Sequence, residues 1–179
     1  MTTSLKNKDQ RVAVFIDVQN MYHSAKNLYQ SRVNFGEILK TAVAGRKLIR
    51  AFAYVVRTKT GEEKPFFDAL TNLGIETRVK DLQEYYGGLK KADWDVGIAV
   101  DAIKTSDSVD VVVIVSGDGD FTPLIEYLQN HGKRVEAMAF GKSTSSKIRE
   151  VADEFIDLEA PVDKYLLKQK RKWPVPLFH

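Results

Sequence analysis

Residues 111–125 read VVVIVSGDGDFTPLI. The five consecutive β-branched residues 111–115 have the length and composition of a strand buried in a parallel sheet. A glycine-containing turn ends this run, and two aspartates, Asp118 and Asp120, follow. Pro123 is suited to the first turn of a helix. Because ligands of open α/β sheets bind at the carboxyl ends of the strands, this stretch predicts two carboxylates at a ligand-binding edge.

On both sides of this stretch, short apolar runs alternate with amphipathic patterns. We expect strands at residues 12–16, 48–56, 75–82, 111–115, 134–140 and 155–158. We expect helices at residues 20–29, 34–45, 65–74, 123–130 and 145–153, and a further helix that begins near Asp95. This alternation predicts an α/β fold with a parallel sheet flanked by helices on both faces. The strand at 75–82 is the least apolar, which favours a position near a sheet edge.

Length and composition are those of one globular domain. The chain has 179 residues, of which 44% are hydrophobic and 28% are charged. It contains no cysteine, which excludes disulfides, thiolate nucleophiles and cysteine-ligated zinc. No apolar segment approaches the roughly 20 residues needed to cross a bilayer, and residues 1–10 lack the apolar core of a secretory signal. We therefore expect a cytoplasmic protein without a membrane partner.

Further aspartates are expected at the same edge as Asp118 and Asp120. Asp17 directly follows the first predicted strand, and Asp95 begins the helix that precedes the 111–115 strand. Each aspartate has a simpler interpretation as a helix cap or turn residue. We consider four coincidental caps less plausible than one shared acidic site.

The helix that begins near Asp95 offers two acidic candidates. Its apolar positions are expected to form one face toward the sheet, following the i, i+3, i+4, i+7 pattern. These positions are Val96, Ala99, Val100 and Ile103. At 100° per residue, Asp95 borders this face, whereas Asp101 lies almost opposite its centre. The spacing therefore favours Asp95 over Asp101 as a member of the site.

Neighbouring carboxylates repel one another unless a cation lies among them. Oxygen ligands without histidine or cysteine suit a hard ion, Mg²⁺ or Mn²⁺. Such an ion can activate water and neutralise charge that develops on a phosphate group. The pattern therefore favours hydrolysis of a phosphodiester.

Four segments together resemble the NYN domain of the LabA-like branch, within the PIN-like nuclease superfamily. They are FIDVQN at 15–20, KADWDVGIAVDAI at 91–103, VSGDGDFTPLI at 115–125 and SSKIREVADEFIDL at 145–158. The resemblance spans about residues 11–158 in the family's order. Two departures are visible, since Val18 stands where the family usually has Gly and Gly119 stands where Ser is common. Neither departure removes a carboxylate.

The resemblance implies a three-layer α/β/α PIN-like fold with a mostly parallel central sheet of five to six strands. It also implies a nuclease that depends on a divalent metal and most often acts on RNA. The family's catalytic and metal-binding carboxylates map onto Asp17, Asp95, Asp118 and Asp120. Asn20 would support them, and Asp101 falls on a motif position despite its unfavourable helix phase.

Other residues are expected around this site. Ser116 and Thr122 are candidates to orient water or phosphate, although both are also ordinary turn and cap residues. Lys90, Lys91, Lys142 and Lys147 are candidates to bind backbone phosphates. Tyr85 and Tyr86 are candidates to stack on unpaired bases, or else to pack their loop onto the body. The expected partner is nucleic acid, in particular single-stranded RNA.

The predicted domain organisation has three parts. Residues 1–10 form a disordered lead-in, residues 11–160 the NYN/PIN-like nuclease domain, and residues 161–179 a basic, proline-containing tail. From residue 164 onward, the tail contains five basic residues and no acidic residue; the basic residues are at positions 164, 168, 170, 171 and 172. It is either a solvated end, an arm that touches nucleic acid, or a segment that docks on a neighbouring subunit and supports a homo-oligomer.

Two other functions compete with a metal-dependent ribonuclease. One is a binding module that holds RNA or a protein on a PIN-like scaffold without turnover. The other is a phosphatase of similar topology. Phosphatases of the haloacid dehalogenase type need a second aspartate two residues after the first, and Gln19 occupies that position after Asp17.

Overall fold

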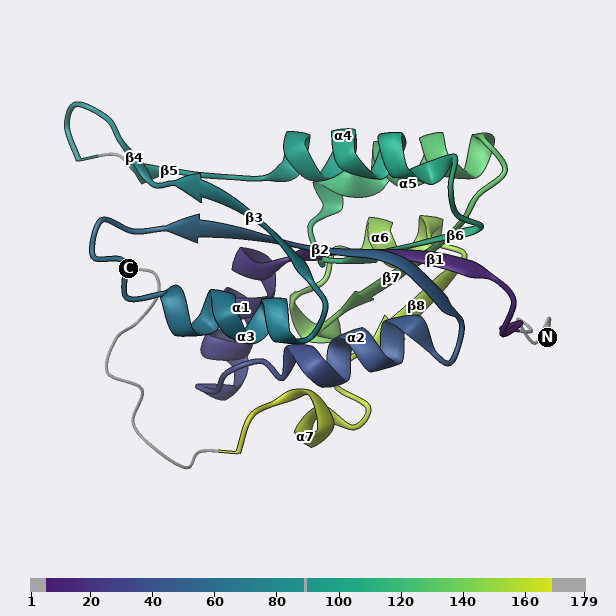
Figure 1. Cartoon of the computed structure of the whole chain (residues 1–179), viewed down its shortest axis with the longest axis horizontal. Coiled ribbons are helices and arrows are strands. Elements are labelled where there is room, and N and C mark those ends of the chain that lie inside the picture. The colour runs from purple at the N-terminus through teal and green to yellow at the C-terminus, as the bar shows by residue number, and fades with distance from the viewer. Residues whose placement is uncertain (1–5, 89, 169–179) are drawn as a thin grey trace.

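The described chain forms a parallel sheet between two layers of helices (Figure 1). The computed structural model describes residues 6–88 and 90–168. Within them, the strands of the sheet are β1 (Arg11–Asp17), β2 (Lys47–Arg57), β3 (Glu76–Asp81), β6 (Val111–Val115), β7 (Arg134–Ala139) and β8 (Glu154–Asp157). Their order across the sheet is β3-β2-β1-β6-β7-β8, and all neighbours pair in parallel. The predicted architecture is confirmed, and β3 lies at an edge as expected.

Helices cover both faces of this sheet. Those on one face are α1 (Val18–Tyr29), α2 (Phe35–Val43) and α3 (Lys64–Asn72). Those on the other face are α4 (Asp95–Ser106), α5 (Thr122–Asn130) and α6 (Ser146–Val151). Within the described chain, none of the helices combines the length and apolar character that a membrane span requires.

The central strand β1 explains how a continuous apolar run is used. Val14 and Ile16 face the core beneath α1, α2 and α3. Ala13 and Phe15 point the opposite way, into the core beneath α4, α5 and α6. All four side chains are fully buried, because both faces of a parallel strand are covered. The carboxyl end of β1 is thereby fixed from both sides, and Asp17 is its last residue.

The predicted apolar face of α4 is wrong. Val96, Val100 and Ile103 are exposed, whereas Ile98 and Ala102 are fully buried against the sheet. The helix is rotated away from the orientation that its apolar spacing favours. Polar contacts with β2 fix this rotation. Trp94, just before the helix, donates a hydrogen bond to β2, and Asp101, in the middle of the helix, accepts one from β2. Tertiary contacts therefore decide which side of α4 faces the sheet, and the spacing of its apolar residues does not.

The segment that carries Tyr85 and Tyr86, which we expected to be a loop, lies between two short antiparallel strands. Strands β4 (Gln83–Glu84) and β5 (Lys90–Lys91) pair with each other. Gly87 and Gly88 between them have positive φ angles, 94° and 81°, which glycine adopts without steric cost. This hairpin projects beyond the end of the sheet toward which β2 and β3 run (Figure 1). The side chains of Lys90 and Lys91 lie outside the described residues.

Both ends of the described chain contact the body of the protein. Lys6, within the predicted lead-in, forms an ion pair with Glu154 at 3.3 Å. At the other end, Tyr165 in α7 (Val162–Tyr165) is buried, and its hydroxyl lies 3.2 Å from that of Thr41. Leu166 forms an antiparallel bridge with a residue of the segment between α1 and α2. The first eight residues of the predicted tail therefore pack on the body, while residues 1–5 and 169–179 of the predicted lead-in and tail lie outside the described chain.

Candidate metal centre

The turn after β6 is held by its own backbone and side chains. The Asp118 carboxylate accepts a hydrogen bond from the Asp120 backbone N–H at 2.9 Å and caps the short helix η1 (Gly119–Phe121). The Ser116 hydroxyl accepts one from the Asp118 N–H at 3.2 Å and is fully buried. These contacts direct both aspartates to the carboxyl edge of the sheet, as the sequence predicts for ligand-binding positions.

Asp95 meets these two aspartates at the start of α4. One carboxylate oxygen from each of Asp95, Asp118 and Asp120 lies within 4.8 Å of the other two. Partial burial raises the pKa of Asp95, and the negative charges of Asp118, Asp93 and Asp120 raise it further. Lys80 opposes this shift. The three carboxylates therefore form an electrostatically strained group that a cation would relieve.

Asp17 lies deeper than this group and is not one of its three members. Its carboxylate caps α1 by accepting from the Asn20 N–H at 3.2 Å, and it accepts from the Ser116 hydroxyl at 3.1 Å. Burial raises the pKa of Asp17 to about 6; these two hydrogen bonds lower it, while the charges of Asp95 and Asp118 raise it. Asp17 is thus both a helix cap and an electrostatic neighbour of the cluster.

Asn20 connects the first helix to the turn after β6. Its side-chain oxygen accepts a hydrogen bond from the Gly117 N–H at 2.9 Å. Because Asn20 also bonds to Asp17 through its backbone, it links the carboxyl ends of β1 and β6. The Thr122 hydroxyl at the start of α5 is buried and has no hydrogen-bond partner within the described chain. The Thr122 hydroxyl is therefore available for a further hydrogen bond.

Two glycines allow a second loop to approach the turn closely. A Cβ on Gly117 would lie 2.9 Å from the Thr144 hydroxyl, and one on Gly119 would lie 2.7 Å from the Ser145 hydroxyl. The Ser145 N–H also donates to the Gly117 carbonyl at 3.0 Å. Ser145 therefore occupies the space of a side chain at position 119. The close approach of Ser145 favours glycine at position 119, where the family that the sequence resembles commonly has serine.

The prediction that Asp101 points away from the sheet is wrong, although Asp101 is not one of the three clustered aspartates. Its carboxylate accepts a hydrogen bond from the Tyr54 hydroxyl at 2.9 Å and lies 3.4 Å from the Arg78 guanidinium. Asp101 thus faces the strands β2 and β3 instead of pointing away from the sheet. The prediction failed because it placed the apolar face of α4 on the wrong side.

Trp94 positions Asp95, although only its adjacency to Asp95 distinguishes it in the sequence. Its indole N–H donates to the Val55 carbonyl at 2.9 Å. Its ring packs edge-on against Tyr54, with centroids 5.3 Å apart, and the Lys80 ammonium lies 4.4 Å from its centroid. The first turn of α4 is thereby anchored to β2 and β3. Only the three-dimensional packing reveals this anchor.

We expect Gly97→Ala to displace the start of α4. A Cβ at this position would lie 2.6 Å and 3.0 Å from two carbons of the Trp94 ring, so the ring or the helix must move. Overpacking of this kind costs about 1–3 kcal/mol of unfolding free energy. Because a small displacement of a ligand weakens a metal site, we expect Mn²⁺ affinity to fall by about tenfold or more. Urea unfolding and Mn²⁺ titration measure the two effects.

Gly36→Ala is the matched control for this substitution. Gly36 also lies in a helix, α2, but a Cβ there would meet its nearest atoms at 3.4 Å and 3.5 Å. We expect the control to leave Mn²⁺ affinity unchanged and to raise stability by about 0.5–1 kcal/mol, since alanine suits a helix better than glycine. Equal Mn²⁺ affinity in the wild type and Gly97→Ala would show that Trp94 does not position Asp95.

The predicted nucleic-acid-binding side chains lie on separate segments. Tyr85 and Tyr86 are exposed on the hairpin, with 51% and 107% of their reference surface accessible. Lys142 lies in the helical turn η2 (Gly141–Ser143) after β7, and Lys147 lies in the first turn of α6. Both lysines are exposed. The η2 loop adjoins the turn after β6, whereas the hairpin directly precedes Asp95 in the chain.

The donor set fits a hard divalent ion. All three grouped residues offer carboxylate oxygens, two are half-buried, and one is exposed to solvent. Mg²⁺ and Mn²⁺ prefer such oxygen ligands, and Mg²⁺ retains several waters that an open position can accommodate. Residues Asp95, Asp118 and Asp120 are therefore suited to hold one of these ions.

Comparisons with known proteins identify relatives over nearly the whole chain. The model of the NYN domain family matches residues 11–159. A curated relative, the low amplitude and bright protein LabA of Synechococcus elongatus, is 26% identical over 182 residues. That alignment covers 93% of this chain and 93% of the relative.

Two solved structures are similar to this chain to different degrees. A crystal structure of a Vibrio parahaemolyticus protein of unknown function has a TM-score of 0.82 and 31% sequence identity, covering 90% of this chain and 99% of that one. A ribokinase from Giardia lamblia has a TM-score of 0.45 and 14% identity, covering 83% and 57% of the two chains. The first similarity extends over the complete relative.

Proposed function

The chain belongs to the NYN domain family, and we propose that it is a metal-dependent ribonuclease. The family places it in the PIN-like nuclease superfamily. The observation that carries the proposal is the convergence of Asp95, Asp118 and Asp120, whose carboxylate oxygens lie within 4.8 Å of one another. A scaffold that only binds a partner gains nothing from carboxylates that repel one another.

In this proposal, Asp95, Asp118 and Asp120 hold Mg²⁺ or Mn²⁺, and Asp17 completes the catalytic set. When bound, the ion would supply positive charge for the scissile phosphate and lower the pKa of a water. Asp17 adds a negative charge next to the cluster. Its contacts with Asn20 and Ser116 hold the carboxyl ends of β1 and β6 together. The reaction is hydrolysis, in which water adds to phosphorus and an alcohol oxygen leaves with a proton.

Residues around the cluster would position the substrate. Ser116, Asn20 and Asp101 support the site through the hydrogen bonds already described, and Thr122 is available to bind water or phosphate. We propose that Tyr85 and Tyr86 stack on bases of single-stranded RNA. The proposed phosphate-binding residues are Lys90, Lys91, Lys142 and Lys147.

The cellular setting is also a proposal. The absence of cysteine from the sequence supports a reducing compartment, and we propose a cytoplasmic location. The basic tail from residue 164 onward supports contact with nucleic acid or with a second subunit. The domain limits 11–160, followed by a tail, remain part of this proposal.

Cleavage of labelled single-stranded RNA tests the proposed function. We expect wild-type protein to cleave this RNA with Mn²⁺ or Mg²⁺, and we expect cleavage to stop when a chelator is added, because the proposed reaction needs the positive charge and the activated water that a bound ion would supply. Electrophoresis of the products measures the rate. Cleavage that continues in chelator would contradict the metal-dependent mechanism, and binding without cleavage would favour a non-catalytic RNA-binding module.

A further inference from the structure

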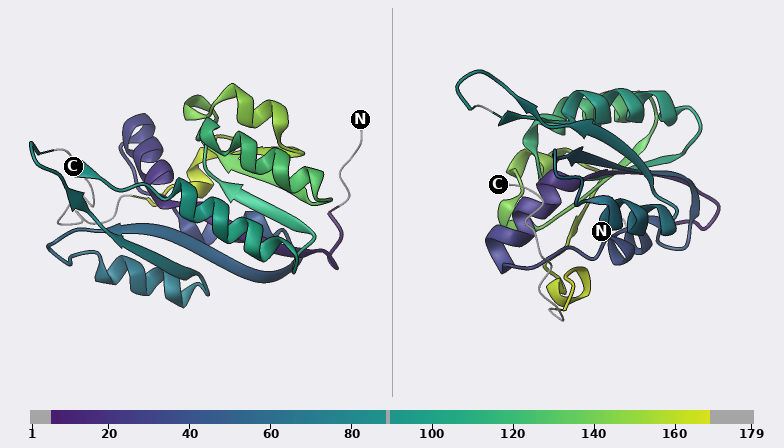
Figure 2. Two further views of the ribbon diagram at one scale, coloured as in Figure 1. Left: turned by 90° about the horizontal axis from the view of Figure 1, so that it is seen from above. Right: turned by 60° about the vertical axis from the view of Figure 1, so that its left-hand side comes forward.

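Beside α4, none of the helices in the described part of the chain covers the outer part of β2 and β3 around Arg50, Glu76 and Arg78. Arg50, Glu76 and Arg78 on this face have side-chain exposures of 43%, 46% and 43%. The helices α4, α5 and α6 lie over the middle of the sheet and its other half (Figure 2, left). The outer part of this sheet face, at Arg50, Glu76 and Arg78, is therefore accessible to solvent, while Phe52 and Tyr54 beside it are buried.

Two guanidinium groups lie over one aromatic ring at this surface. The guanidinium carbons of Arg50 and Arg78 lie 4.4 Å and 5.1 Å from the Phe52 ring centroid. Phe52 itself is only 1% exposed, because its neighbours cover it. An arginine stacked on a ring keeps its outer planar face available, and unpaired bases stack on such planes.

Acidic partners hold these two arginines in place. Arg50 donates two hydrogen bonds to Glu76, at 2.9 Å and 2.7 Å, and Arg78 lies 3.4 Å from Asp101. A side chain that is already oriented loses little conformational entropy when a ligand binds. The ion pairs also offset the positive charges, so stacking should contribute more to binding than net charge does.

Lys80 continues this surface to the acidic cluster. Its ammonium donates to the Asp93 carbonyl at 2.7 Å, two residues before Asp95. Lys80 pairs in register with Val56 of β2, and Arg50 lies six residues before Val56. At the rise of an extended strand, this separation corresponds to about 20 Å along the sheet. Such a length accommodates roughly four or more nucleotides of single strand.

We propose that an unpaired nucleic-acid strand extends from the acidic cluster across the outer face of β2 and β3, where Arg50 and Arg78 stack on its bases. This inference rests on the proposed nuclease function and adds the route of the substrate beyond the cleaved bond. Lys80 contacts the nucleic-acid strand between the acidic cluster and the two arginines. The surface recognises single strands, because bases in a duplex do not expose their faces for stacking.

Binding of a labelled oligouridylate of about 12 nucleotides, measured by fluorescence anisotropy in chelator, tests this route without requiring cleavage. The variant is Arg50→Gln/Arg78→Gln. We expect its Kd to rise by about tenfold, because stacking on one base contributes about 1–3 kcal/mol. The control is Arg11→Gln/Lys47→Gln, which removes two exposed cations paired with Asp110 and Asp9 at the amino-terminal ends of β1 and β2. The control should change Kd by less than about threefold.

A conservative variant guards against misfolding of the glutamine variant. Arg50→Lys/Arg78→Lys retains both charges but loses the planar groups, and we expect its Kd to rise by about threefold or more. Thermal melting confirms that each variant is folded. Wild-type affinity in both arginine variants, or an equal loss in the control, would overturn the proposed route.

Cleavage assays separate this inference from the proposed function. With Mn²⁺, the glutamine variant should lose more of its kcat/KM on the longer oligonucleotide than on a labelled dinucleotide, which is too short to reach both the cluster and the arginines. If the variant matches wild type on both substrates, the route is wrong while the nuclease function stands. If wild-type protein cleaves neither substrate, the nuclease function is wrong, and the anisotropy measurement alone decides whether the strand binds here.

Discussion

Asp118→Asn is expected to reduce the metal-dependent cleavage rate by about 100-fold or more. The substitution removes one of the three carboxylates that lie within 4.8 Å of one another. Charge stabilisation by a metal ion contributes several kcal/mol to a phosphoryl-transfer transition state, and each 1.4 kcal/mol corresponds to about a tenfold change in rate. Single-turnover cleavage of labelled RNA at saturating Mn²⁺ measures the loss.

The fold should survive this substitution, because asparagine retains an oxygen that can accept the Asp120 N–H. Without the charge of Asp118, the pKa of Asp95 should decrease, and the metal-free variant should be at least as stable as wild type. Asp110→Asn is the matched control, since Asp110 pairs with Arg11 at the opposite edge of the sheet. Wild-type cleavage by Asp118→Asn would exclude the proposed cluster as the catalytic site.

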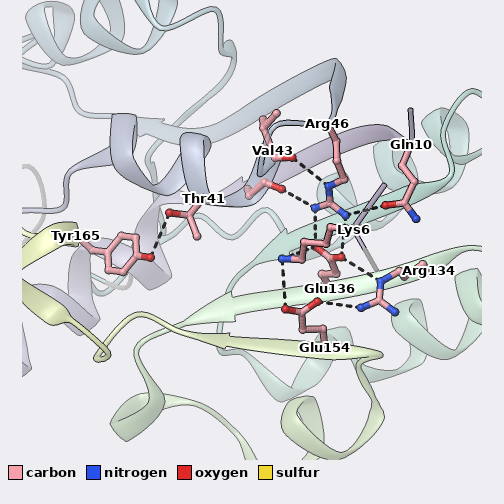
Figure 3. A network of polar contacts seen from close by, with 10 residues as sticks. Lys6, Gln10, Thr41, Val43, Arg46, Arg134, Glu136, Glu154 and Tyr165 are labelled. Atoms are coloured by element: carbon pink, nitrogen blue, oxygen red, sulfur yellow. Dashed lines mark hydrogen bonds and ion pairs between the residues drawn. The ribbon is translucent and has the colours of Figure 1, made fainter. Parts of the chain in front are cut away.

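Arg46→Ala is expected to lower the free energy of unfolding by about 3 kcal/mol, the low end of the usual cost of breaking a buried ion pair, because Arg134 still contacts Glu136 at 3.1 Å. Arg46 and Glu136 are both inaccessible to solvent and form two hydrogen bonds, at 2.9 Å and 2.8 Å (Figure 3). Arg46 also donates to the Ala42 and Val43 carbonyls at the end of α2. Burial alone would raise the pKa of Glu136, but Arg46 and the other nearby cations outweigh it and lower the pKa. Urea unfolding at neutral pH measures the loss.

Two further variants separate the buried pair from a general loss of charge. Arg46→Met/Glu136→Met removes both charges together and should recover much of the stability lost by Arg46→Ala. Lys64→Ala removes an exposed partner of Asp68 in α3 and should cost no more than about 0.5 kcal/mol. If Arg46→Ala costs as little as Lys64→Ala, the buried pair does not stabilise the fold.

The sequence was sufficient for the order of strands and helices and for the edge at which the acids meet. Both predictions depend on local patterns, namely continuous apolar runs for buried parallel strands and a turn directly after them. The start of the helix expected from residue 34 was also readable, and the Asn34 side chain caps this helix by accepting the Glu37 N–H at 3.2 Å. These features require few contacts between distant residues.

The rotation of α4 was not readable from the sequence. Val96 and Val100 are exposed, because the indole of Trp94 and the carboxylate of Asp101 set the rotation of the helix through contacts with β2. The placement of two arginines over Phe52 was not predicted, for a related reason. Arg50 and Arg78 are 28 positions apart in the chain, and only the pairing of β2 with β3 brings both onto Phe52.

The position of β1 between β2 and β6 has a consequence for synthesis on the ribosome. Its partner β2 follows within about 30 residues, so one edge of β1 can be paired while the chain is still short. The other edge waits for β6, which is not made until residue 111. At about 5–20 residues per second, that apolar edge stays open for several seconds and is the segment of the nascent chain most in need of protection by a chaperone.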